Sequence, residues 1–406
     1  MKNLQGMFNE FIESEPLFFN REALTISFDP ENILHRDKQI EVIGRMLAPV
    51  LKGGKPSNLF VYGKTGTGKT MVCKHVAGEL KKVAEKSDIR IKIIYVNCKM
   101  GKSADTEYRL LAHLIKEFGK EVPFTGLPTD KLYKDFFEIL DKEKRTVILM
   151  LDEIDTLIKK NGDEMLYVLT RANQDLKNAK LSIIGITNDL GFINRLDPRV
   201  RSSLGEEELI FPPYNAMQLQ DILRERAKLG FVESGVDSGV VEKCAAYAAQ
   251  EHGDARRALD LLRVAGELAE RGGFKKVETL HVDKAEDKID HDRVLEIVKS
   301  QPRQSQLVLF SILNCSNNQR NLRSGRVNYV QTADVWNNYQ NFCKQFRMKS
   351  LTQRRVSDLV AEYDLFGMVT TKVISKGRYG RTRTIEFALD DDMRRKVEGA
   401  LREVFG

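Results

Sequence analysis

The stretch Asn58–Leu80 reads "NLFVYGKTGTGKTMVCKHVAGEL", and its hydrophobic period changes partway along. Residues 58–62 are rich in β-formers, whereas apolar side chains recur at helical spacing over residues 71–80. The glycine-rich run between them lets backbone N–H groups turn inward on an anion, and the following helix adds its positive end. The stretch therefore predicts a strand, a phosphate-binding loop and a helix.

The loop matches the pattern GxxxxGK[ST], in which several positions have a chemical role. Lys69 would neutralise the β- and γ-phosphates of a nucleotide, and the Thr70 hydroxyl would ligate Mg²⁺. With glycine at ~7% of residues, a chance match in such a chain is about a one-in-a-hundred event. We expect the nucleotide to be held by Gly63, Lys64, Thr65, Gly66, Thr67, Gly68, Lys69 and Thr70.

Acidic residues follow the apolar run in "TVILMLDEID", residues 146–155. The run is typical of a central parallel strand, and such strands point their carboxyl ends at the sheet edge where ligands bind. Asp152 would hold Mg²⁺, and Glu153 would orient or deprotonate the attacking water. In the later strand "LSIIGITNDL", Asn188 could position the water, although turns also favour asparagine.

About five short strands alternate with helical segments over the first 212 residues, a pattern that predicts a doubly wound α/β sheet. About fifty residues separate the second strand from the acidic one, more than a single crossover helix requires. Two helices fit this interval, at residues 110–118 and 132–140. From residue 214 to about 288 the period is helical throughout, and the polar segment 281–292 is expected to be a hinge.

Net charge locates a binding surface. The chain carries +7 overall, but residues 291–406 hold 20 basic and 12 acidic residues, whereas the first 290 hold 45 and 46. With 406 residues, two or three domains are expected. The excess charge in the last third favours a polyanionic partner over a merely solvated basic face.

No apolar run approaches the ~20 residues that a membrane helix needs, and the N-terminus has acids where a signal peptide would be apolar. The five cysteines are scattered and are expected to be reduced, and the histidines form no metal-ligand pattern. These features predict a cytoplasmic protein with no membrane partner.

The last third predicts a winged helix, a helix-turn-helix variant in which the last helix enters a major groove. Helical patterns at residues 305–313, 332–346 and 351–367 precede two alternating strands, and Thr332 is expected to cap the second helix. The turn "SKGRYGRTR" would approach DNA phosphates or a minor groove. A protein-docking winged helix is the alternative. The expected DNA-binding residues are Gln353, Arg354, Arg355, Lys376, Arg378, Tyr379, Arg381 and Arg383.

The order of motifs resembles that of AAA+ ATPases: GKTGTGKT, LMLDEID, GITND, RLDPRVRSSLG and HGDARRALDLLR. The segments "PENILHRDKQIEVI" and "FPPYNAMQLQDILRERA" narrow the resemblance to the archaeal origin-recognition initiators, relatives of the eukaryotic Orc and Cdc licensing proteins. The resemblance covers nearly the whole chain. It implies an AAA+ P-loop NTPase core over residues 1–212, a helical lid over 213–290 and a winged-helix DNA-binding domain over 291–406.

The resemblance also implies an activity and partners. An initiator of this kind binds ATP or ADP with Mg²⁺, hydrolyses ATP slowly as a switch, and grips double-stranded origin DNA. Its further partners would be the replicative helicase and other copies or paralogous initiator subunits, and it would be associated with the nucleoid. Initiators in this family carry an extra helix in the long second crossover that leans on DNA, although an ordinary crossover also fits.

By resemblance, Asn188 is the sensor-1 residue and Arg256 the sensor-2 arginine on the lid. Tyr214 and Arg226 match lid-entry positions that touch the nucleotide. Local sequence alone also fits Arg256 on an exposed helix face and Tyr214 in plain packing. The resemblance implies two further sets: the Leu34–Arg36 segment, with His35 and Arg36, beside the adenine, and Arg199 or Arg201 as a finger for a neighbouring subunit's ATP.

Two other functions remain open from the sequence. A DNA motor of the branch-migration type also joins an AAA+ ATPase to a winged helix, although the segment around Tyr214 argues against it. An ATP-regulated transcription or signalling regulator is the second, and the repeats that signalling ATPases usually append are absent from the sequence.

Overall fold

The computed structural model describes residues 5, 12–13, 15–99, 106–123, 126–204, 207–322, 329–375 and 381–405. The chain divides into two compact units, Met1–Asp283 and Lys284–Gly406. Over the described residues, no helix has both the length and the apolar character needed to cross a membrane.

A five-stranded parallel sheet forms the centre of the first unit, in the order β2-β3-β4-β1-β5. Strand β3, which lies between β2 and β4, is buried along its whole length, as the apolar run in the sequence predicts. The carboxyl ends of β2 and β3 are in register, with Asn97 opposite Asp152. The strands are β1 Leu59–Tyr62, β2 Ile91–Asn97, β3 Thr146–Asp152, β4 Lys180–Thr187 and β5 Glu207–Ile210.

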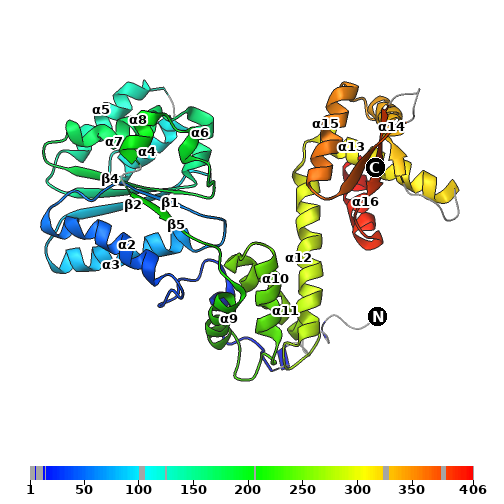
Figure 1. Ribbon diagram of the computed structural model, residues 1–406, viewed down its shortest axis with the longest axis horizontal. Helices are drawn as coiled ribbons and strands as arrows, with labels where there is room; N and C mark the ends of the chain where they lie inside the picture. The colour runs from blue at the N-terminus through cyan, green and yellow to red at the C-terminus, as the bar shows by residue number, and fades with distance from the viewer. Residues whose placement is uncertain are drawn as a thin grey trace. The chain divides into compact units, whose positions relative to one another are not determined.

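Helices cover both faces of this sheet (Figure 1). On one face, α2 (Asp37–Leu47) and α3 (Lys69–Lys86) pack over one apolar cluster. A second cluster fills the other face. The predicted doubly wound α/β core is confirmed. The helices of the second face are α4 Glu107–Glu117, α5 Thr129–Leu140, α6 Ile154–Asn161, α7 Glu164–Arg171 and α8 Pro198–Leu204.

Three helices form the lid of the first unit: α9 (Ala216–Gly230), α10 (Val240–Gln250) and α11 (Ala255–Arg271). Asn215 and Gln218 close a capping box at the start of α9. The N-terminal segment packs against this lid, because the ring of Phe18 stacks on Phe231 with centroids 4.8 Å apart. Further along, residues 26–34 line a cavity of the first unit.

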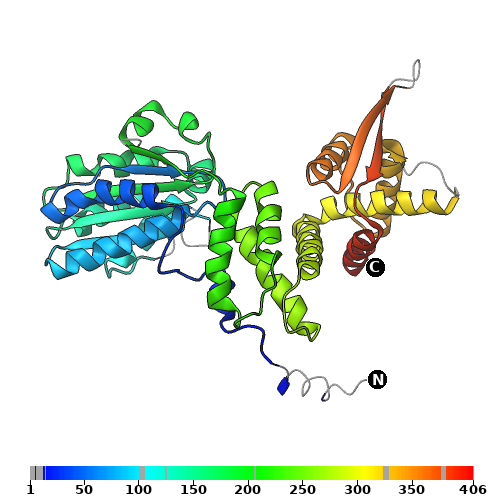
Figure 2. The same ribbon diagram turned by 60° about the horizontal axis from the view of Figure 1, so that its bottom comes forward.

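The second unit has a winged-helix fold. Its antiparallel sheet has the order β6-β8-β7, and the β7–β8 hairpin extends beyond the helices of this unit (Figure 2). The predicted three helices and hairpin are confirmed, while the short β6 and the last helix are additions to the prediction. The elements are α13 Arg303–Leu322, β6 Tyr329–Gln331, α14 Thr332–Gln345, α15 Gln353–Leu365, β7 Val369–Ser375, β8 Arg381–Phe387 and α16 Asp391–Phe405.

Two local expectations differ from the structure. The expected hinge over residues 281–292 lies within one helix, α12 (Thr279–Ser300), and the two compact units divide inside it. The segment contains lysines, a glutamate and an alanine, which are good helix formers, so its polarity alone did not indicate a break. Thr332 is the first residue of α14, and Gln331 is its N-cap, in a capping box with Asp334.

Candidate active site

A cavity of about 690 Å³ lies between the carboxyl edge of the sheet and the lid of the first unit. Segments far apart in the sequence meet there, including the N-terminal residues 26–34, the glycine-rich loop and the start of α11. Ten of the predicted site residues line it: Gly66, Gly68, Lys69, Thr70, Asp152, Glu153, Asn188, Tyr214, Arg226 and Arg256.

The glycine-rich loop needs glycine at two positions. Gly66 and Gly68 have φ values of 71° and 86°, in the left-handed region where side chains are strained. Gly68 is the N-cap of α3, so the loop leads directly into the helix whose positive end faces the cavity. This local geometry is that of a phosphate-binding loop.

Lys69 is a buried cation with three oxygen partners. Its Nζ lies 2.8 Å from Gly63 O, 2.7 Å from Lys64 O and 2.8 Å from Asn188 Oδ1. Burial lowers the pKa of Lys69 to about 8, against a smaller opposing effect of Asp152. The ammonium group is therefore poised to gain from any anion that enters the loop.

Asp152 is held by three donors. Its Oδ2 accepts hydrogen bonds from Thr70 Oγ1 and from the Tyr95 hydroxyl, both at 2.8 Å, and its Oδ1 accepts from the Glu153 N–H at 3.0 Å. Burial, followed by the charge of Asp152, raises the pKa of Tyr95, so this phenol stays a donor. A hydroxyl beside a carboxylate is the hard oxygen set that suits Mg²⁺, with phosphate oxygens and water as further ligands.

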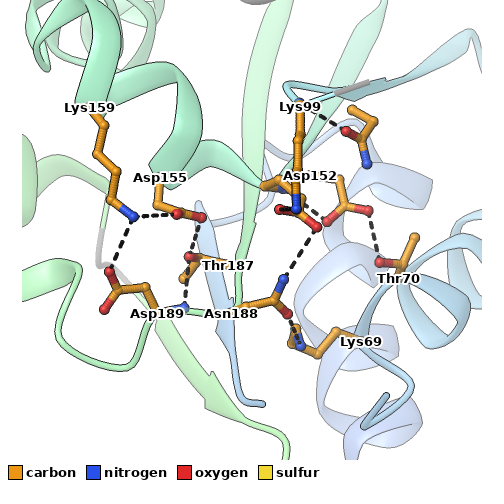
Figure 3. A network of polar contacts seen from close by, with 11 residues as sticks. Lys69, Thr70, Lys99, Asp152, Asp155, Lys159, Thr187, Asn188 and Asp189 are labelled. Carbon is orange, nitrogen blue, oxygen red and sulfur yellow. Dashed lines mark hydrogen bonds and ion pairs between the residues drawn. The ribbon is translucent and has the colours of Figure 1, made fainter. Parts of the chain in front are cut away.

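Glu153 faces the same cavity from a left-handed backbone conformation, φ 54°, at the N-cap of α6. Asn188 Nδ2 donates to Glu153 Oε1 at 3.3 Å, and Lys99 Nζ lies 3.7 Å from Glu153 Oε2. Asn188 therefore connects Lys69 to Glu153, and Figure 3 shows its contact with Lys69. The predicted carboxylate, amide and lysine form one polar chain.

A second polar network adjoins the contacts among Lys69, Asn188 and Glu153. Asp155 Oδ1 accepts a hydrogen bond from Thr187 Oγ1 at 2.7 Å, and Lys159 bridges Asp155 and Asp189 (Figure 3). Asn188 lies between two residues of this network, Thr187 and Asp189. The amide of Asn188, which directly follows β4, is held by Glu153 at the N-cap of α6.

Tyr214 and Arg36 meet behind the glycine-rich loop. Arg36 is buried, its Nε donates to Thr67 O at 2.9 Å and its Nη2 donates to Pro212 O at 2.7 Å. Its guanidinium carbon lies 3.7 Å from the Tyr214 ring centroid. Arg36 thus braces the phosphate loop against the entry to the lid, and it does not line the cavity as a base contact would.

His35 and Arg226 tie the N-terminal part of the core to the lid. His35 Nε2 lies 3.0 Å from Asp221 Oδ2 on α9 and is outside the cavity lining. Arg226 lines the cavity, but its Nη1 and Nη2 donate to Ala23 O and Phe28 O. Its guanidinium group therefore holds the N-terminal segment against the lid.

Arg199 and Arg201 lie on α8 and do not line this cavity. Arg199 makes two hydrogen bonds to the carboxylate of Asp197 and lies over the ring of Tyr167. Arg201 is exposed, and its side chain makes no polar contact with the described part of the chain.

The predicted DNA-binding residues are only partly described. Gln353, Arg354 and Arg355 are exposed at the start of α15, where Arg355 Nη1 lies 3.5 Å from Glu362. Arg383 is half-buried on β8. Lys376, Arg378, Tyr379 and the side chain of Arg381 lie outside the described residues.

Several cavity residues were missed from the sequence. Tyr95 and Lys99 could have been predicted, because the carboxyl ends of parallel strands share one edge of a sheet. That rule was applied to β3 and β4 but not to β2. Leu34 lines the cavity and belongs to the segment expected there by resemblance, whereas residues 26–33 were not assigned to the site, because their place in the cavity depends on docking against the lid.

The fold and site define the chain as an AAA+ ATPase with a helical lid and a winged helix. A family model described as "AAA domain" matches residues 53–190, "Cdc6 AAA+ ATPase-type lid domain" matches 220–287, and "CDC6, C terminal winged helix domain" matches 296–397.

Similar proteins and solved structures show to which family of AAA+ ATPases the chain belongs. The "ORC1-type DNA replication protein" of Pyrococcus horikoshii is 49% identical over 94% of this chain and 90% of its own length. "ORC1-type DNA replication protein 1" of Methanosarcina mazei is 48% identical over 98% and 94%. The structure of the Aeropyrum pernix Orc1 protein in complex with DNA superposes with a TM-score of 0.82 and 42% identity, over 96% of this chain and 98% of that one. The chain belongs to the family of archaeal ORC1-type DNA replication proteins.

Proposed function

We propose that the chain is an ATP-controlled replication initiator that binds duplex origin DNA and hydrolyses ATP slowly, as a switch. One observation carries this proposal: the same chain holds a phosphate-binding site and a winged helix. The polar residues of that site are Lys69, Thr70, Asp152, Glu153 and Asn188. Between Arg303 and Arg383 the sequence holds 14 basic and 4 acidic residues, which suits a polyanionic partner.

In the first unit, ATP is the substrate, and each polar residue of the phosphate-binding site has a role in binding or hydrolysing it. Lys69 neutralises the β- and γ-phosphates, and Arg256 approaches the phosphates from the lid, where its charge already acts on Lys69. Glu153 orients or deprotonates the attacking water, and Asn188 holds that carboxylate in place. Mg²⁺, held by Thr70 with Asp152 behind it, would neutralise charge on the phosphate oxygens.

The structure favours Arg201 over Arg199 as the finger that reaches a neighbouring subunit's ATP. Arg199 is committed to Asp197 and Tyr167 within its own chain, and freeing it would cost those contacts. Arg201 is exposed on the same helix without such a commitment among the described residues. Other copies or paralogous initiator subunits are the proposed partners of this surface.

In the second unit, the exposed start of α15 enters a major groove, and the basic hairpin contacts phosphates or a minor groove. The DNA-bound state of the A. pernix relative supports duplex DNA as the ligand. We retain the domain division 1–212, 213–290 and 291–406, with each family model falling inside one domain. Recruitment of the replicative helicase is the proposed downstream step.

A genome-wide footprint of the bound protein tests this function. We expect enrichment at one or a few replication start sites in the unmodified chain. Enrichment at many promoters would indicate a transcription regulator instead, and binding spread over branched repair intermediates would indicate a DNA motor. Either of these outcomes would contradict an initiator.

A further inference from the structure

The loop that precedes α11 lies directly on the glycine-rich loop. Ala255 N donates to Gly66 O at 3.2 Å, which joins lid and phosphate loop by a backbone hydrogen bond. Two successive left-handed residues, His252 and Gly253, shape the lid loop, with φ 83° and 70°. A Cβ on Gly253 would lie 2.2 Å from Tyr214 O, so the lid loop is pinned close to the lid entry.

The carboxylate of Asp254 lies against Gly66, at the place where the lid loop meets the glycine-rich loop. A Cβ on Gly66 would lie 1.6 Å from Asp254 Oδ1 and 2.9 Å from Oδ2, so the carboxylate sits where any larger residue would put its side chain. Asp254 Oδ1 also accepts a hydrogen bond from the Arg256 N–H at 2.8 Å, as the N-cap of α11. The charge of Asp254 also opposes the lowering of the Lys69 pKa, as a minor effect beside burial and the charge of Asp152.

The lid thus presents two opposite charges to the phosphate chain. Arg256 lines the cavity and attracts phosphate, whereas the Asp254 carboxylate lies against the loop that cradles it. A carboxylate placed near a polyphosphate raises the free energy of binding more for a triphosphate than for a diphosphate, because the triphosphate carries more negative charge. Asp254 is half-buried and lies beside the cavity, so salt screens this repulsion only in part.

We propose that Asp254 is a specificity-determining residue, whose carboxylate makes the closed lid favour the nucleoside diphosphate over the triphosphate. The proposal rests on the nucleotide site proposed above and concerns its preference between two ligands. In the closed arrangement the Gly66–Ala255 hydrogen bond and the Asp254 contact form together. A γ-phosphate repels the carboxylate, so triphosphate binding opposes this closure while the diphosphate permits it.

The substitution Asp254→Asn removes the negative charge but keeps the N-cap of α11. Asparagine caps helices about as well as aspartate and has nearly the same volume, so the variant keeps the hydrogen bond to Arg256 N–H. Asp254→Ser is a second neutral capping variant with a smaller side chain. Asp260→Asn is the matched control, because it removes a carboxylate from the same helix that pairs with Arg263 outside the cavity.

The measurement is the Kd of the full chain for Mg–ADP and for a Mg-bound non-hydrolysable ATP analogue, by titration calorimetry. In both Asp254 variants we expect the analogue to gain about tenfold relative to ADP, while Asp260→Asn keeps the ratio of the unmodified chain. The thermal midpoint of each variant shows whether the cap has been kept.

Three outcomes overturn the proposal. An unchanged ratio in Asp254→Asn shows that the carboxylate does not discriminate between the nucleotides. Equal weakening of both ligands shows a capping role only. If the unmodified chain binds neither nucleotide, the nucleotide site itself is wrong, which is a separate failure visible before any substitution.

Discussion

The ammonium group of Lys69 lies among neutral oxygen atoms, and this environment determines how it responds to a phosphate. Its three protons are directed at two backbone carbonyls and the Asn188 amide, all of them neutral acceptors. Burial of the charged form among neutral groups lowers its pKa to about 8. Phosphate oxygens are negatively charged, so their arrival stabilises the protonated lysine more than these neutral oxygens do.

This difference predicts a pH dependence of nucleotide binding. Above pH 8 the free chain loses the Lys69 proton, and binding must then take one up, so we expect the Kd for ATP to rise by about fivefold between pH 8 and pH 9. Between pH 7 and pH 7.5 the Kd should be nearly constant. Calorimetry in buffers of different ionisation enthalpy would also show proton uptake; a flat profile to pH 9 would contradict this role of Lys69.

Helix α15 joins the core of the winged helix to its proposed DNA face. Val356, Leu359, Val360 and Tyr363 are buried on one side. The first turn exposes Gln353, Arg354 and Arg355, which stand where a helix-turn-helix variant meets base edges and phosphates. One amphipathic helix thereby fixes the position of the charges relative to the fold.

The double variant Arg354→Ala with Arg355→Ala tests this helix. We expect weaker binding to duplex DNA and a salt slope of log K that is shallower by about 2, because each phosphate contact contributes roughly 0.9. Arg395→Ala with Arg402→Ala is the matched control, since it removes the same charge from α16, where both side chains contact acids of their own helix. Equal losses in the two double variants would show that only net charge matters.

Elements with a strong local pattern were predictable from the sequence, and contacts made by docking were not. The strand, loop and helix around Lys69 and the buried strand before Asp152 appear as predicted. The contacts of Arg36 with Thr67 O and Pro212 O could not be predicted, because they depend on the packing of the lid entry against the phosphate loop. The same holds for Asp254, since its contact with Gly66 depends on the packing of the lid against the phosphate loop, which has no periodic signature.

At the scale of the whole molecule, the nucleotide cavity lies within Met1–Asp283, whereas the winged helix lies within Lys284–Gly406. Net charge divides in a similar way, with +8 over residues 291–406 and −1 before them. An initiator controlled by ATP requires a free-energy coupling between its two ligands, and such coupling is reciprocal. The central claim is therefore that nucleotide state changes DNA affinity, and that DNA changes nucleotide affinity by the same factor.

Fluorescence anisotropy of a labelled origin duplex, titrated with the full chain in Mg–ADP and then in a Mg-bound non-hydrolysable ATP analogue, measures this coupling directly. We expect the two Kd values to differ by at least about fivefold, the lower end of typical allosteric coupling, and the difference to vanish in Lys69→Ala. Equal Kd values for the unmodified chain in both nucleotides, with both shown to be bound, would contradict the claim.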